Sequence, residues 1–248
     1  NKRQRLDFRA VFDPQRALLM NFTSIIGKSH LLLSITFLVA IGIGTVILGL
    51  IYFVHERYDA SPGTIGLFTS TYFISYFIGC FFTRPLGKRL LPRYSIMLAT
   101  GLMTVILTLI LIFPGLPLAF VLIALFGGSV SLFFPPTAGW MSSGVEGKVL
   151  SKTISRWNIS WSTGSILSSY IAGFLTEIDI RYPIILSIIL FLFCTILVLA
   201  ASLFLTNIKA DRFQDAKPNT IGNKDYSTFL RFPSWLLVFT VYVMVGVI

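Results

Sequence analysis

The sequence has little charge, almost no histidine and only two cysteines. Charged residues make up 12% of the 248 residues, about half the share in ordinary soluble domains. We find no metal-ligand spacing, no glycine-rich nucleotide-binding motif and no set of nucleophile, base and acid. We therefore expect no metal, no cofactor and no enzymatic activity. Cys80 and Cys194 both lie in apolar runs, which argues against a disulfide framework.

Long apolar runs take the place of charge. The chain is 55% hydrophobic with a mean hydropathy of +0.82. Runs of about 20 apolar residues are typical of transmembrane helices. We predict six complete spans at 31–54, 64–82, 94–113, 118–140, 154–176 and 182–206, and a seventh that begins near residue 232. The predicted fold class is an all-α membrane protein, a bundle of six transmembrane helices plus a partial seventh.

The polar segments divide the chain into four parts. Residues 1–30 are a basic leader, predicted to be either a cytoplasmic tail or a helix lying in the membrane interface. Residues 31–206 hold the six spans, 207–231 form a polar linker, and 232–248 begin the seventh span. The first residue is not Met and the last lies within an apolar run, so we expect a longer natural chain.

The net charge of +10 is explained by topology better than by a nucleic-acid partner. Of the 20 Lys and Arg residues, 18 lie in the leader or in the connections after spans two, four and six; the exceptions are Arg57 and Arg181. By the positive-inside rule the basic side, including the N-terminus, is cytoplasmic. The absence of any eukaryotic targeting feature favours a bacterial inner membrane.

Two spans carry unusual patterns. The fourth has Pro135-Pro136, which predicts a kink or break, and a break at membrane depth needs protein or a water-filled cavity beside it. In the fifth, Trp161, Ser165, Ser169 and Gly173 recur every four residues, a stripe that suits either close helix packing or a cavity lining. Arg156 near the start of this span either snorkels to the surface or serves in gating or substrate binding.

The connection between spans two and three has a recognisable pattern. It reads Gly79-Cys-Phe-Phe-Thr-Arg84-Pro-Leu-Gly87-Lys88-Arg89. With the six spans, the basic connections and the long linker, this resembles the N-terminal half of a major facilitator superfamily transporter. The residues echoing the family's signature loop are Gly79, Arg84, Gly87, Lys88 and Arg89, whereas its Asp is replaced by Thr83 or Arg84, depending on the register.

This resemblance implies a secondary active transporter that works by alternating access, built from two inverted three-helix repeats in each half. Its substrate would bind near the midplane, with the first and fourth spans lining the cavity. The implied cavity residues are Thr45, Ser129, Ser131, Asn158 and Trp161. We expect a monomer in the lipid bilayer that moves a small neutral or amphipathic molecule, with a proton or sodium ion as coupling ion. The alternative is a polytopic receptor or assembly scaffold that transports nothing.

Overall fold

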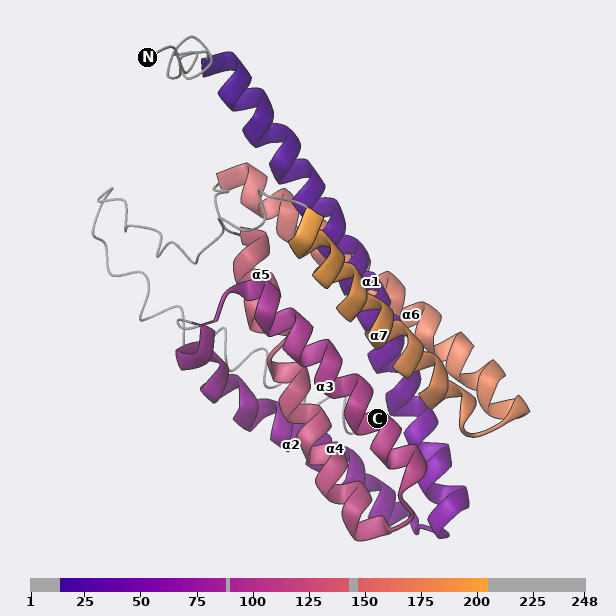
Figure 1. Ribbon diagram of the computed structural model, residues 1–248. Coiled ribbons are helices and arrows are strands. Elements are labelled where there is room, and N and C mark those ends of the chain that lie inside the picture. Colours follow the sequence, from indigo (N-terminus) through magenta and orange to yellow (C-terminus); the bar gives the residue numbers. More distant parts are fainter. Residues whose placement is uncertain (1–13, 88–89, 143–146, 205–248) are drawn as a thin grey trace, which may run out of the picture. The chain divides into compact units, whose positions relative to one another are not determined.

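In the computed structural model of the chain, the described backbone consists of helices joined by short turns, with no strand among those residues (Figure 1). It describes residues 14–87, 90–142 and 147–204, and the side chains of 30–83, 90–142 and 147–203. The helices are α1 (Pro14–Tyr58), α2 (Pro62–Gly87), α3 (Pro92–Ile112), α4 (Leu116–Ser131), α5 (Phe134–Ser142), α6 (Gly147–Ile178) and α7 (Tyr182–Phe204). The predicted linker 207–231 and the seventh span lie outside the described residues.

Five of the six predicted spans each coincide with one helix and the fourth with α4 and α5, but α1, α2 and α6 extend well past the predicted ends. α1 begins at Pro14, so the second half of the leader continues the first span and is not a separate interface helix. α2 runs to Gly87, five residues past the predicted end of the second span, and α3 begins at Pro92, two residues before the predicted start of the third. The reason is physical: hydropathy marks where a membrane would end, whereas a helix continues until a cap or breaker stops it. Ser61 caps the start of α2, since its Oγ accepts the Thr64 N–H at 3.3 Å.

Five helical segments of the described chain are long and apolar enough to cross a membrane: His30–Tyr58, Pro62–Thr83, Pro92–Ile112, Leu116–Ser142 and Tyr182–Leu203. The fourth of these joins α4 and α5. The 32-residue α6 is long enough but more polar than the others. That it also crosses the membrane stays a prediction, which its packing along α1 supports.

The helix contacts reveal two inverted repeats, one of α1–α3 and one of α4–α7 (Figure 1). Short connections make successive spans antiparallel, so the fourth span runs opposite to the first. The main contacts are α1 with α6 and α7, α4 with α2 and α3, and α3 with α7. The two repeats correspond helix by helix: α1 to α4, α2 to α6 and α3 to α7. Under this correspondence the contact of α1 with α6 matches that of α4 with α2, and the contact of α1 with α7 matches that of α4 with α3. The contact of α3 with α7 matches itself. At that self-paired contact the Thr100 and Thr195 hydroxyls lie 2.8 Å apart.

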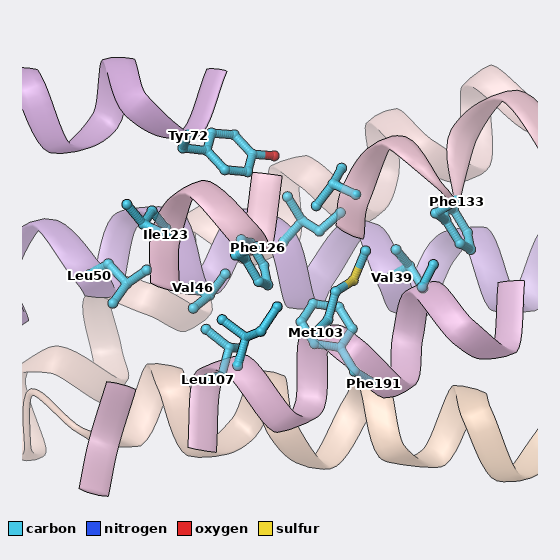
Figure 2. Packing of buried hydrophobic residues seen from close by; sticks show 14 of the residues in the cluster. Val39, Val46, Leu50, Tyr72, Met103, Leu107, Ile123, Phe126, Phe133 and Phe191 are labelled. Atoms are coloured by element: carbon cyan, nitrogen blue, oxygen red, sulfur yellow. The ribbon is translucent and has the colours of Figure 1, made fainter. Parts of the chain in front are cut away.

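The core is apolar and joins both repeats (Figure 2). Phe126 of α4 is fully buried between Tyr72 of α2, at 5.9 Å between ring centroids, and Phe191 of α7, at 6.2 Å. Met103 and Leu107 of α3 are also fully buried beside them (Figure 2). This core leaves α2 and α6 with the most exposed faces.

Candidate functional site

The break in the fourth span has a clear cause and is chemically satisfied. α4 ends at Ser131 and α5 begins at Phe134, which places Pro135 and Pro136 in the first turn of α5. A helix tolerates proline there because those N–H groups have no partner in the helix. The two prolines deprive the carbonyls of Ser131 and Leu132, four residues earlier, of their usual donors.

Hydroxyl groups from neighbouring helices reach both of these carbonyls. Ser95 Oγ of α3 donates to the Leu132 oxygen at 2.9 Å. Thr83 Oγ1 of α2 lies 3.1 Å from the Ser131 oxygen and shares its single proton with the Gly79 oxygen at 2.9 Å. The predicted break is therefore confirmed, and protein side chains satisfy the backbone there.

The buried polar residues predicted to line a cavity lie in helix contacts. Thr45, Ser129 and Ser131 are each at most 3% exposed. Thr45 Oγ1 lies 3.5 Å from the Ser168 oxygen on α6, whereas Ser129 and Ser131 donate to carbonyls of their own helix. All three hydroxyls thus have partners inside the bundle, and a role in substrate binding stays a prediction.

An aromatic group gathers around the start of α5. It consists of Phe134 of α5, Tyr76 of α2, and Trp157 and Trp161 of α6. The Phe134 ring meets the other three edge to face, with centroid distances of 4.8 Å to Trp161, 6.2 Å to Tyr76 and 6.5 Å to Trp157. All four side chains are only half-buried. The sequence pattern indicated Trp161, but it did not indicate Tyr76 or Phe134, which lie far from it along the chain.

Hydrogen bonds to α1 hold the tryptophan-bearing end of α6 in place. Trp157 Nε1 donates to Thr36 Oγ1 at 3.0 Å, and Ser160 Oγ donates to the Leu33 oxygen at 2.7 Å. Further along, an added Cβ at Gly164 would lie 2.7 Å from the Phe37 oxygen, which shows how closely the two helices approach. The aromatic group is therefore carried by rigidly packed elements, as a binding site requires.

The exposed surface of α6 has two distinct faces. Asn158, Ser162 and Ser169 lie on one side of the helix and are exposed. Ile159, Ile166, Tyr170 and Phe174 lie on the next side and are between 62% and 76% exposed. Because polar groups are costly to expose to lipid tails, the face with Asn158 suits water or further protein and the other suits lipid.

The stripe of small residues predicted in this span is only partly used in packing. Gly173 has no atom within 4 Å of an added Cβ, and Ser169 is exposed. The close contacts to α1 come instead from Gly164 and Ser168, since a Cβ at Gly44 would overlap Ser168. The far half of the stripe therefore remains uncovered by the described residues.

The remaining predicted site residues lie at the surface, in the contact between α2 and α4, at the end of α2 or outside the described residues. Arg156 is exposed, which fits both of its predicted roles. Gly79 packs closely on Ser131, since an added Cβ would overlap the Ser131 hydroxyl. Arg84 and Gly87 lie in the last turns of α2, and Lys88 and Arg89 lie outside the described residues.

A family model described as Major Facilitator Superfamily matches residues 32–248. The chain belongs to the Major Facilitator Superfamily. The match begins one residue after the predicted start of the first span and covers all six spans. No curated protein matches the chain significantly. Members of the superfamily are transporters, so the protein is an integral, multi-pass membrane protein with a transport function.

Proposed function

We propose that this superfamily member is a secondary active transporter that moves a small solute by alternating access. The solute binds at the half-exposed aromatic group, with Asn158 on the neighbouring face of α6 as a hydrogen-bonding group. The observation that carries the proposal is the convergence of Tyr76, Phe134 and Trp161 from α2, α5 and α6 at the break in the fourth span.

The chemistry of this site favours a neutral or amphipathic solute. Aromatic rings provide large apolar contact areas with defined geometry, and an amide both donates and accepts hydrogen bonds. The six predicted spans contain no Asp or Glu, which disfavours a strongly cationic solute at this site. Coupling to a proton or sodium ion, as symport or antiport, then requires groups in the second half.

The break between α4 and α5 makes the fourth span suitable as a helix that changes shape during transport. The α4–α5 junction lacks two regular helix bonds, and its carbonyls are held by single hydroxyls from α2 and α3. We further propose that the protein is a monomer in the inner membrane of a bacterium. The distribution of Lys and Arg supports a cytoplasmic N-terminus.

The test is transport by the full-length protein in proteoliposomes. Sugars, amino acids, carboxylates and lipophilic cations are screened with and without proton and sodium gradients. For the transported solute, Trp161→Ala should lower kcat/KM about tenfold or more through the lost ring contact, while Trp161→Phe stays near wild type.

Phe193→Ala serves as the matched control, because Phe193 is 50% exposed on α7 and does not belong to the aromatic group. It should transport like the wild type. If no solute moves although the protein is correctly inserted, the transporter proposal is wrong. If a solute moves and Trp161→Ala transports it normally, the proposed site is wrong.

A further inference from the structure

One hydrogen bond joins the aromatic group to a fully buried hydroxyl of the first span. Trp157 Nε1 donates to Thr36 Oγ1 at 3.0 Å, and Thr36 is 0% exposed. An indole ring has a single N–H donor, so this bond uses the whole donor capacity of Trp157. The bond therefore turns the polar edge of the ring toward α1 and leaves only hydrocarbon for contact with a solute.

The inverted repeats show what lies at the equivalent place in the other repeat. The close contact of Gly44 with Ser168, between α1 and α6, matches that of Ser131 with Gly79, between α4 and α2. An added Cβ on the glycine would lie 2.7 Å from the Ser168 Cβ in the first contact and 2.9 Å from the Ser131 Cβ in the second. In both, the serine hydroxyl donates at 2.6 Å to the carbonyl three residues earlier. These two contacts fix the register in which the repeats correspond.

In this register the equivalents of Thr36 and Trp157 are both apolar. The equivalent of Thr36 is Ile123, since each lies eight residues before the close contact on its helix. The equivalent of Trp157 is Phe68, since each lies eleven residues before it. Phe68 and Ile123 are at most 3% exposed and line the same small cavity. The fold thus accepts an apolar pair at this place, so helix packing alone requires neither the hydroxyl nor the indole.

The hydrogen bond consequently belongs to the aromatic group and is not a general feature of the repeats. A buried N–H without a partner is costly, which favours the orientation of Trp157 that reaches Thr36. In that orientation the Trp157 ring lies 6.5 Å from Phe134 between centroids. Its N–H is then occupied, and the polar group that remains for a solute on this part of α6 is the exposed Asn158.

We propose that Thr36 is a specificity-determining residue of the transporter, which acts by positioning Trp157. By holding the indole N–H, Thr36 keeps that side of the solute site apolar. The hydrocarbon part of an amphipathic solute lies against Trp157 and its polar part at Asn158. A solute with an oxygen atom in its hydrocarbon part is rejected, because that oxygen would be buried without a donor. This role rests on the proposed solute site at the aromatic group.

The first measurement needs no known solute. In the full-length protein, ultraviolet resonance Raman difference spectra with and without Trp157→Phe isolate the indole band that reports hydrogen bonding of the Trp157 N–H. Thr36→Val removes the acceptor and should move this band to the position of an unbonded indole, whereas Thr36→Ser should keep it. Ser160→Ala is the matched control: it removes the neighbouring 2.7 Å bond to the Leu33 oxygen on α1 and should leave the band unchanged.

The second measurement compares, in proteoliposomes, the transported solute with an analogue that carries a carbonyl group in its hydrocarbon part. Thr36→Val frees the indole N–H for this carbonyl, so the kcat/KM of the analogue relative to the parent should rise at least fivefold. Thr36→Ser should stay near the wild-type ratio. In a Trp157→Phe background, which has no N–H, Thr36→Val should change the ratio less than twofold. Thr36→Ala replaces Thr36→Val if that protein fails to fold, as judged by its elution in size-exclusion chromatography.

The two measurements separate the role of Thr36 from the proposed function. An unchanged band in Thr36→Val overturns the role of Thr36, and so does a changed band with an unchanged kcat/KM ratio, while transport itself stands in both cases. If no solute moves although the protein is correctly inserted, the proposed function is wrong and the specificity role falls with it, whatever the band shows.

Discussion

Single glycines decide how closely the helices pack. Gly127 and Gly128 are adjacent in α4, but they meet different surroundings. An added Cβ at Gly127 would lie 2.4 Å from the Tyr72 backbone oxygen of α2, whereas at Gly128 nothing lies within 4 Å. Because backbone atoms of a packed helix cannot move aside easily, only Gly127 is required for the contact between α2 and α4.

We therefore expect Gly127→Ala to destabilise the protein by about 1–3 kcal/mol through overpacking. Thermal unfolding in detergent should show a Tm several degrees below that of the wild type. Gly128→Ala is the matched control and should be neutral or slightly stabilising, since alanine is the better helix former. Equal effects of the two substitutions would show that the close approach at Gly127 is incorrect.

Residue type alone did not show which helices the hydroxyls contact. Thr45 Oγ1 donates to the Ser168 oxygen on α6 at 3.5 Å, 123 residues further along the chain. Thr36, which the sequence did not single out, accepts the bond that orients Trp157. Thr36 and Trp157 are 121 residues apart, so no local pattern could reveal their contact.

At the scale of elements, the junction of α4 and α5 is the most specific feature. The Ser95 hydroxyl replaces the bond that Pro136 cannot make to the Leu132 carbonyl. Removing it leaves a partly buried acceptor without this donor, and an unsatisfied buried acceptor costs about 1–3 kcal/mol. We expect Ser95→Ala to lower the Tm by several degrees.

Restoring the backbone donor that Pro136 lacks tests whether Ser95→Ala acts through the Leu132 carbonyl. Pro136→Ala returns an N–H four residues after Leu132, so Ser95→Ala should lose less than half as much stability in that background. Pro135→Ala restores the donor for Ser131 instead and should not rescue Ser95→Ala. If both proline variants restore the stability of Ser95→Ala equally, the Ser95 hydroxyl does not act by replacing the N–H that Pro136 lacks.

The two faces of α6 lead to a labelling prediction. In a background with Cys80 and Cys194 replaced by serine, Asn158→Cys should react with a membrane-impermeant maleimide at least ten times faster than Ile166→Cys. A thiol reacts as the thiolate, which requires water, and the Asn158 face is the more polar of the two. Equal rates in membrane vesicles open to the reagent on both sides would contradict the division into two faces.

Most elements could be predicted from the sequence, with characteristic errors at their ends. The six helices and the break at Pro135-Pro136 follow from hydropathy and proline chemistry, which are local properties. The extension of α2 to Gly87 was missed because charge was taken to end the helix. The aromatic group could be predicted only at Trp161, since Phe134 and Tyr76 reach it through the packing of three helices.

For the whole molecule, the distribution of basic residues predicts a cytoplasmic N-terminus. Single cysteines at two exposed positions test it, with the native cysteines removed. Pro114→Cys, between α3 and α4, should react with impermeant maleimide only from outside the cell. Lys148→Cys, at the start of α6, should react only from the cytoplasmic side. The reverse pattern would show that the positive-inside rule fails for this protein.

The sequence by itself determined the class of molecule, the positions of the spans and the resemblance to the Major Facilitator Superfamily. These properties depend on the hydropathy and spacing of residues close together in the chain. The tertiary structure alone decided the pairing of the two inverted repeats, the partners of the buried hydroxyls and the convergence of Tyr76, Phe134 and Trp161. Those contacts join helices that are distant along the chain, and a helix's own periodicity cannot specify which neighbour covers each of its faces.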